Sequence, residues 1–242
     1  MNGFMKRIYG DGTFGSNWRH RDIGNCKEYT TTDSDLINGF VAQDIDKPET
    51  WFVAAEGALI MSSRNQNGGS NINGHFSLIC GIAIQVEYST DTVNKLYFRS
   101  ANFPTTTKRN IFTVRKKAGK GENNVDFFCN GIKIELPYNF FILPTTSKVD
   151  RNANDPMYIN RYNTTVSNAG QNVNAGKLSA VNYAQSDEEI ARDAANGYQQ
   201  ATSGLFLLNV DFDKTTGDNL TDTSPNAYTI TSTGNKNFSP FQ

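Results

Sequence analysis

Short apolar runs bounded by turn residues dominate the hydrophobic pattern of this chain, which is typical of β-strands. The runs occupy residues 36–42, 50–55, 58–62, 95–100, 110–116, 125–130, 132–136, 157–161, 178–183, 205–212 and 227–232. A longer run at 75–87 contains Gly81 and many β-branched residues, which favours one bent strand or two over a buried helix. The pattern therefore predicts a mainly β protein.

Local signals indicate how some of these strands pair. Asn130-Gly131 lies between two apolar runs and predicts a two-residue type I′ hairpin turn. Residues 50–55 and 58–62 are expected to pair with each other across Glu56-Gly57. The hairpin around residues 108–120 is basic, and we expect its Lys and Arg side chains to form a solvated edge that prevents edge-to-edge pairing. Contact with phosphate or an anionic glycan is the alternative role.

One segment, at about 187–196, has the signature of an α-helix. Ser186 and Glu189 form a capping box, and acidic residues fill the first turn, where the helix dipole favours them. Gly197 suits the position that follows the last helical residue.

Residues 1–35 are rich in Gly, Asp, Thr and Arg, which predicts an N-terminal arm at 1–35 outside a domain at 36–242. Such an arm cannot bury enough apolar surface alone, so we expect it to be ordered against another chain, in a homo-oligomer or a larger shell. The first residues lack the apolar stretch of a secretory signal. If Met1 is the native start, the protein is expected to be made in a cytosol.

Composition excludes several classes of protein. The 242 residues contain 23 Lys and Arg against 24 Asp and Glu, so the basic surface of a general nucleic-acid binder is not expected. Aromatic residues make up 12% of the chain, which is too many for a disordered one. No apolar run reaches the about 18–20 residues that a membrane-spanning helix needs, so no membrane insertion is expected.

The three cysteines, Cys26, Cys80 and Cys129, do not form a disulfide framework, because their number is odd. Cys80 and Cys129 lie in apolar runs and are expected to be small core fillers. A metal-binding or nucleophilic role is the alternative, but the chain has no C-x-x-C motif and only His20 and His75 as histidines.

Four motifs between residues 110 and 198 resemble, in order and spacing, the laminin-G-like, concanavalin A-like lectin/glucanase superfamily. They are FFCNGI at 127–132, PMYINR at 156–161, GKLSAVNY at 176–183 and SDEEI at 186–190. The chain departs from the family pattern at Ser179, where an acidic residue is common, and at Ala184-Gln185. The resemblance implies a concanavalin A-like jelly-roll β-sandwich with the single short helix at about 187–196.

The segments LFLLNVDFD at 205–213 and LTDTSPN at 220–226 are similar to the opening of that family, yet they follow its closing helix. Either the module is circularly permuted, or the tail supplies strands to a neighbouring subunit. The unbroken apolar run predicts an inner strand, antiparallel beside residues 178–183 in the permuted case.

Candidate site residues are few. Glucanases of the superfamily need alternating carboxylates on one strand, E-x-D-x-(x)-E, and because no such run exists we predict no enzymatic activity. Trp18 is expected at an exposed partner surface and His75 at the end of an Asn/Gly loop, so both are candidate ligand-binding residues. For His75, the alternative is a polar residue at a strand edge.

Asp211, Asp213 and Asp218 resemble part of a calcium loop, since calcium takes six to eight oxygen ligands. The run lacks the closing Glu of an EF-hand, so an acidic turn after a strand is the alternative. No other cofactor is expected.

Fold does not determine function, so three functions stay open. The first is a structural component of a bacteriophage virion, such as a fibre, tail or capsid-decoration protein, whose partners are other virion proteins. The alternative is a carbohydrate-binding module of a bacterial cell-surface protein, located outside the cell. An enzyme acting on glycosides is the third, and the missing carboxylate strand argues against it.

Overall fold

The structure is a computed structural model of the whole chain. It describes residues 21–22, 28–31, 46–56, 59–62, 75–80, 84–89, 95–99, 110–119, 124–134, 139–141, 157–159, 174–212 and 220–233.

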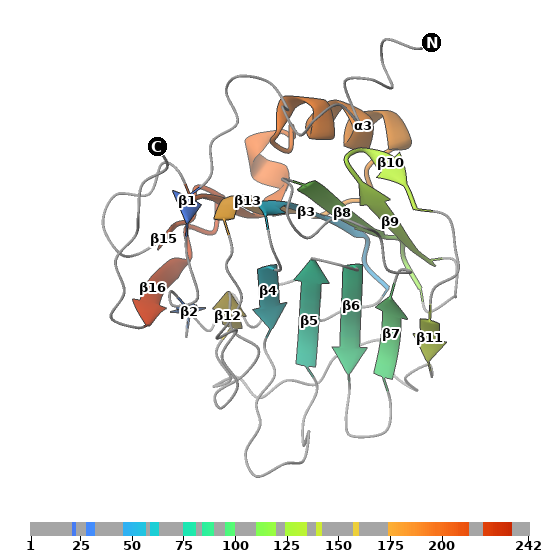
Figure 1. The fold of residues 1–242 in the computed structure, drawn as a ribbon, viewed down its shortest axis with the longest axis horizontal. Helices are drawn as coiled ribbons and strands as arrows, with labels where there is room; N and C mark the ends of the chain where they lie inside the picture. The colour runs from blue at the N-terminus through green and yellow to red at the C-terminus, as the bar shows by residue number, and fades with distance from the viewer. Residues whose placement is uncertain are drawn as a thin grey trace.

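Two antiparallel sheets form the fold (Figure 1). The first is seven-stranded, in the order β1 (Arg21–Asp22), β13 (Asn174–Val181), β3 (Glu49–Glu56), β8 (Asn110–Lys116), β9 (Val125–Cys129) and β10 (Ile132–Lys133), with β14 (Phe206–Asp211) also paired to β13. The second is nine-stranded, in the order β11 (Asn139–Phe141), β7 (Lys95–Arg99), β6 (Ile84–Ser89), β5 (His75–Cys80), β4 (Leu59–Ser62), β12 (Met157–Ile159), β2 (Glu28–Thr31), β16 (Thr229–Thr233) and β15 (Leu220–Thr221).

The main hydrophobic core lies between the two sheets. Trp51 and Val53 of β3 belong to it, together with Phe112 of β8, Leu78 of β5 and Ile230 of β16. Because side chains alternate along a strand, Phe52 and Ala54 of β3 and Ile111 of β8 face the other side of the first sheet. Both faces of this sheet are therefore buried at its centre, and all seven residues of β8 are buried.

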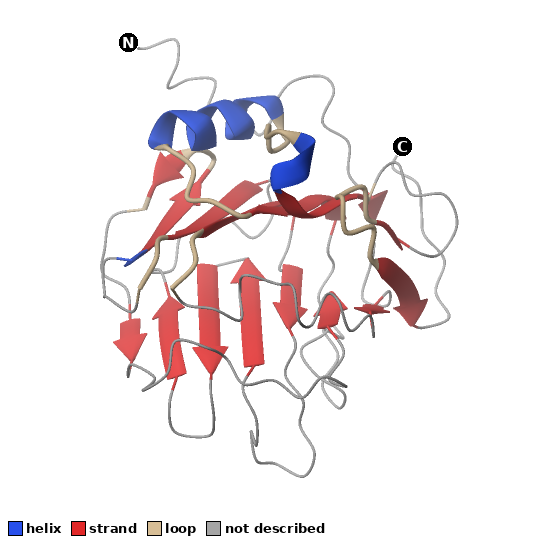
Figure 2. Ribbon diagram, turned by 180° about the vertical axis from the view of Figure 1, so that it is seen from behind, coloured by secondary structure: helices blue, strands red, loops and turns tan. Residues whose placement is uncertain are grey.

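Helix α3 (Asp187–Asn196) covers the outer face of the seven-stranded sheet, away from the second sheet (Figure 2). Ala194 of the helix packs on Phe52, Ala54 and Ile111 of the sheet in a second hydrophobic cluster. The predicted capping box is confirmed, because Glu189 N–H donates to the Ser186 side chain and Ser186 N–H donates to Glu189. The predicted end is confirmed as well: Gly197 has a φ of 78° in the left-handed region.

The predicted hairpin turn at Asn130-Gly131 connects β9 and β10. Both residues have positive φ, 53° and 78°, as a type I′ turn requires. A Cβ added to Gly131 would lie 3.0 Å from Ala191 Cα and 3.1 Å from Ala194 Cβ. The turn therefore packs tightly against helix α3, and this prediction is confirmed.

The C-terminal strand β14 pairs antiparallel with β13 in the same chain, from Lys177 opposite Asp211 to Val181 opposite Phe206. This is the pairing that the permuted arrangement predicts. The predicted inner position is wrong, because β14 lies at the margin of the described sheet. The edge of β14 that faces away from β13 contacts the turn after β15. There Val210 forms a β-bridge with Asp222, and Thr223 N–H donates to the Asn209 carbonyl at 2.9 Å.

One predicted pairing is wrong. β3 and β4 do not pair across Glu56-Gly57: β3 lies in the seven-stranded sheet and β4 in the nine-stranded one. The apolar pattern does not distinguish the predicted hairpin from the observed arrangement, because β3 and β4 would face the same core in both. The run at 75–87 forms two paired strands, β5 and β6.

Two segments of the predicted N-terminal arm belong to the sandwich. β1 pairs with β13, and β2 lies between β12 and β16. Backbone hydrogen bonds hold such strands even where the sequence is polar, so a pattern of apolar runs does not predict them. The rest of residues 1–35 and the expected strand at 36–42 lie outside the described residues.

Candidate functional site

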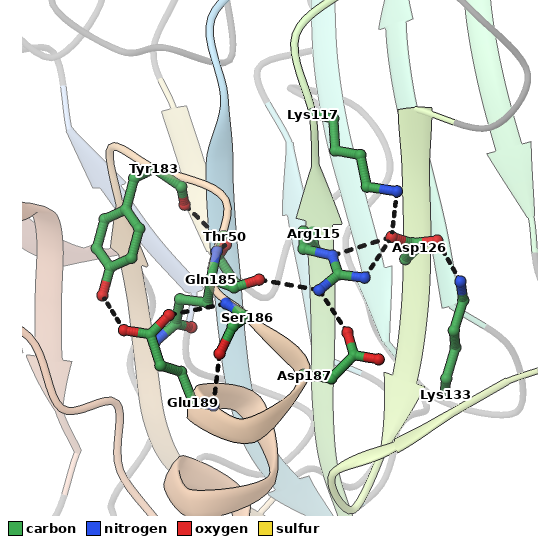
Figure 3. Close-up of polar contacts among 10 residues, drawn as sticks. All are labelled: Thr50, Arg115, Lys117, Asp126, Lys133, Tyr183, Gln185, Ser186, Asp187 and Glu189. Carbon is green, nitrogen blue, oxygen red and sulfur yellow. Dashed lines mark hydrogen bonds and ion pairs between the residues drawn. The ribbon is translucent and has the colours of Figure 1, made fainter.

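An ion-pair cluster joins the β8–β9 hairpin to the start of helix α3 (Figure 3). Its centre is Asp126 of β9, whose side chain is 7% exposed. Oδ2 of Asp126 accepts from Arg115 Nη2 at 2.6 Å and lies 3.0 Å from Lys117 Nζ, while Oδ1 lies 2.8 Å from Lys133 Nζ. Three cations therefore meet one carboxylate.

The cluster stabilises the ionised form of Asp126. Burial raises the pKa of this carboxyl, but hydrogen bonds from Lys133, Lys117 and Arg115 outweigh burial and lower the pKa to about 2. Lys117 and Lys133 are about half-exposed, whereas Arg115 is buried. The predicted solvated basic edge is therefore wrong for Arg115 and for the buried Lys116, whose Nζ donates to the Lys47 carbonyl.

Arg115 also holds the helix to the sheet. Its Nη1 donates to Asp187 Oδ1 at 2.6 Å and to the Gln185 carbonyl at 2.9 Å, and its guanidinium lies 5.0 Å from the centre of the Phe128 ring. The five donors of an arginine can satisfy a carboxylate and a carbonyl together, so this side chain joins β8, β9 and α3.

A chain of buried amide groups continues from Gln185 along the underside of the helix. Gln185 N–H donates to Thr50 Oγ1 at 3.0 Å, and its Nε2 donates to Asp193 Oδ2 at 2.7 Å. Gln199 Nε2 donates to Gln185 Oε1 at 2.9 Å and to the Thr50 carbonyl at 3.2 Å, and Gln199 Oε1 accepts from Ser179 Oγ at 2.8 Å. These bonds fix Gln199 to β3 and β13.

Between this anchor and the helix cap, Tyr198 projects outward. Among the described residues, two large hydrophobic side chains are exposed: Tyr198 at 45% and Leu205 at 37%. The backbone of Tyr198 is held on one side by Gly197, whose N–H donates to the Asp193 carbonyl at 2.9 Å, and on the other by the buried Gln199. The result is an exposed aromatic ring on a constrained backbone.

Polar groups surround this ring. Lys177 Nζ lies over the Tyr198 ring, 5.9 Å from its centre, and also 3.1 Å from Asp211 Oδ2. Gln200 Nε2 donates to Tyr198 Oη at 3.2 Å. Lys177 and Asp211 are opposite each other on β13 and β14, and both face away from the core that contains their neighbours Leu178 and Val210. We call Tyr198, Gln200, Lys177 and Asp211 the Tyr198 platform.

Most of the site residues predicted from the sequence are not tested. Trp18, Asp213 and Asp218 lie outside the described residues, and His75 begins β5 with its side chain outside them. Asp211 is described, and it pairs with Lys177. Among the described residues no group of three or more His, Cys, Asp or Glu side chains could hold a metal ion. The calcium site at Asp211, Asp213 and Asp218 stays a prediction.

The two described cysteines behave as core residues. Cys80 is buried in the main core, and Cys129 packs against that core. Burial raises the pKa of the Cys80 thiol, and it raises the pKa of Cys129 to about 12. A protonated thiol is a poor nucleophile and a poor metal ligand. The predicted role as core fillers is confirmed for this pair.

The sequence alone did not point to Tyr198, Lys177 or Gln200. An apolar residue directly after a helix-ending glycine is usually a packing contact with the helix, so the pattern at Gly197-Tyr198 does not predict exposure. Lys177 looks like an ordinary polar position of an alternating strand. Their proximity depends on how the helix docks on the sheet.

No family model matches the chain, and no curated protein matches it in sequence. Solved structures do match its fold. The chain is similar to a candidate carbohydrate-binding protein from Bacteroides ovatus, with a TM-score of 0.55 and 11% identity over 92% of this chain and 59% of that one. It is also similar to the CBM40 module of the Ruminococcus gnavus IT-sialidase, with a TM-score of 0.46 and 13% identity over 72% of this chain and 96% of that one.

At such low identity, the similarity shows the fold alone. The predicted fold class is confirmed: the protein is a mainly β, lectin-like sandwich of antiparallel sheets with the helix at 187–196. No helix among the described residues is long and apolar enough to cross a membrane.

Proposed function

We propose that the protein is a non-catalytic carbohydrate-binding module and that the Tyr198 platform is its binding site. The observation that carries this proposal is the exposed Tyr198 ring, held between Gly197 and the buried Gln199 and flanked by Lys177 and Asp211. The candidate carbohydrate-binding protein of similar fold supports the class of function but not the position of the site.

The platform combines the two kinds of contact that a sugar offers. A pyranose ring has an apolar face of C–H groups, which can pack on an aromatic ring, and a rim of hydroxyl groups. Lys177 and the Gln200 amide can donate hydrogen bonds to hydroxyl oxygens, and Asp211 can accept from hydroxyl groups. A few convergent polar groups around an apolar surface are typical of small-ligand sites.

Constraint of the backbone favours binding as well. Ordering a mobile side chain or loop on binding costs free energy, and a site that is already ordered avoids part of this cost. The Gly197 cap and the three side-chain hydrogen bonds of Gln199 order the backbone around Tyr198 without a ligand.

Catalysis is not part of the proposal. Retaining glycosidases need two carboxyl groups about 5–5.5 Å apart, and the sequence does not contain the E-x-D-x-(x)-E run that supplies them in glucanases. Asp211, the carboxylate of the platform, is paired with Lys177. The proposal places the module at a cell surface or outside the cell. The virion role, with virion partners and an oligomer, stays a prediction, since no observation favours it.

Binding to a glycan panel tests the proposal, with titration calorimetry for the best ligand. We expect Tyr198→Ala to weaken binding about tenfold or more, because the stacking surface is lost. Tyr198→Phe keeps the ring and should bind nearly as the unchanged protein does. Leu205→Ala is the matched control, because Leu205 is similarly exposed but lies away from the platform. Its carbonyl accepts a hydrogen bond from Asn182 N–H, which follows the end of β13 that is far from Lys177. Equal binding by Tyr198→Ala and the unchanged protein would refute the proposal.

A further inference from the structure

Among the described residues, the two cations at the Tyr198 platform are each paired with a carboxylate. Lys177 Nζ lies 3.1 Å from Asp211 Oδ2. Arg192 borders the platform through Gln200, whose carbonyl accepts from Arg192 Nη2 at 3.1 Å, and the same guanidinium is paired with the buried Asp193 at 2.9 Å. These two cations and two carboxylates sum to a formal charge of zero.

The ion-pair cluster at the other end of helix α3 has a different charge. Its three cations, Arg115, Lys117 and Lys133, face the two carboxylates Asp126 and Asp187, which leaves a formal charge of +1. Lys117 and Lys133 are 46% and 41% exposed. If an acidic ligand bound near this helix, this cluster would attract it more strongly than the platform.

An acidic sugar would meet two obstacles at the platform. Its carboxylate would compete with Asp211 for Lys177, and it would lie close to the Asp211 carboxylate, where like charges repel. The Lys177 and Asp211 side chains are only 20% and 16% exposed, so water screens this repulsion less than at a fully exposed site.

A neutral sugar meets no such conflict. A hydroxyl oxygen can accept from Lys177 Nζ while the hydroxyl group beside it donates to Asp211, so that the ion pair stays intact. Lys177 Nζ lies over the Tyr198 ring and is paired with Asp211, so hydroxyl groups at the edge of a sugar packed against the exposed part of the ring would meet this ion pair.

From this arrangement we infer that the Tyr198 platform selects neutral pyranose sugars, bound by one C–H face and two adjacent hydroxyl groups, over sugars that carry a carboxylate. The inference rests on the proposed function and adds the class of ligand. Selection comes from the Asp211 carboxylate, which accepts a hydrogen bond from a hydroxyl group and repels the carboxylate of an acidic sugar.

A matched pair of ligands tests the inference: a neutral hexose oligosaccharide that binds the protein, and its counterpart with one C6 hydroxymethyl group oxidised to a carboxylate. Calorimetry at low and at physiological salt should show about tenfold weaker binding of the acidic member. Binding of the neutral member should change little with salt, because no net charge is neutralised.

Two variants locate the selection. Asp211→Asn keeps the size of the side chain and removes the repulsion, so the preference for the neutral member should shrink or invert. Lys177→Gln removes the cation and should weaken the acidic member further. Circular dichroism and a thermal melt of each variant check the fold, and if Asp211→Asn does not fold, Lys177→Gln still tests the inference.

The possible outcomes separate the inference from the proposed function. Preference for the acidic member that is lost in Tyr198→Ala would overturn the inference and leave the proposed function standing. If the acidic member still binds Tyr198→Ala but no longer binds Lys133→Gln, its carboxylate binds at the ion-pair cluster. That result would overturn both the inference and the proposed function. Binding of neither member, nor of any glycan in the panel, would overturn the proposed function itself.

Discussion

At the scale of single residues, the outer face of the first sheet depends on a buried carboxylate that three cations compensate. Asp126 is nearly enclosed by Arg115, Lys117 and Lys133. Removing one member of a buried ion pair usually destabilises more than the pair itself contributes, because the remaining charges stay buried without a partner.

We predict that Asp126→Asn lowers the free energy of unfolding by about 2–3 kcal/mol, since the buried Arg115 then keeps the exposed carboxylate of Asp187 as its charged partner. Urea denaturation measures this change. Asp187→Asn is the control, because Asp187 is 62% exposed and its pair with Arg115 should contribute at most about 1 kcal/mol. Similar losses in both variants would contradict this account of Asp126.

The same carboxyl predicts a pH dependence. The pKa of Asp126 in the folded protein is about 2, below its ordinary value near 4, so the folded state favours the ionised form. Its contribution, about 2 kcal/mol, is present above pH 4 and is lost as the pH falls through 2. Asp193 acts in the opposite direction, because burial raises its pKa, so its protonation favours folding. Unfolding free energies between pH 5 and 2 should decline more in the unchanged protein than in Asp126→Asn.

At the scale of elements, helix α3 and the β9–β10 hairpin hold each other in place. Gly131 in the turn has positive φ, and a side chain there would meet the helix backbone at Ala191. The helix in turn begins at the Ser186 capping box and ends at Gly197, so both of its ends are specified locally.

Gly131→Ala should therefore lower the free energy of unfolding by about 1–3 kcal/mol, from the strained backbone and from displacement of the helix. Gly204→Ala is a matched control: a Cβ at Gly204 meets nothing within 4 Å, and its φ is not in the left-handed region. That variant should be neutral or slightly more stable. Equal melting temperatures for the two variants would show that the turn and the helix are not coupled.

At the scale of the whole molecule, the C-terminal segment completes the sandwich. Leu208 and Val210 enter the core from β14, Phe212 enters it directly after that strand, and Ile230 enters it from β16. Asp222 links the two strands: its Oδ1 accepts from Asn209 N–H at 2.9 Å, and its Oδ2 accepts from Tyr228 N–H at 3.1 Å. The D-T-S-P-N motif that resembles the family opening is thus a structural turn.

Deletion of residues 204–242 should abolish cooperative unfolding. Each buried Leu- or Phe-sized side chain contributes roughly 1.5–3 kcal/mol, so the loss approaches the whole stability of a typical domain. Circular dichroism and calorimetry of the truncated chain measure this, with Leu205→Ala as a folded control. A truncated chain with an unchanged melting temperature would show that the tail is dispensable.

The sequence by itself determined what neighbouring residues decide among themselves. The Asn130-Gly131 turn, the helix between Ser186 and Gly197 and a strand predicted at 178–183, observed as β13, follow from backbone preferences and from side-chain periods within a few residues. Burial of the apolar run at 205–212 followed as well, because such a run has to be covered by a core. Whether it pairs within the chain or with a neighbouring subunit stayed open, and the structure pairs it with β13 of the same chain.

Only the tertiary structure decided which faces are covered. Arg115 sits on the polar side of an alternating strand, and helix α3 closes over it, so a position that is usually solvated became the centre of a buried network. The Tyr198 side chain is apolar enough for a core position. It is exposed because Gln199, the next residue, is anchored on β3 and β13. Burial depends on contacts between segments far apart in the chain, and no local pattern contains that information.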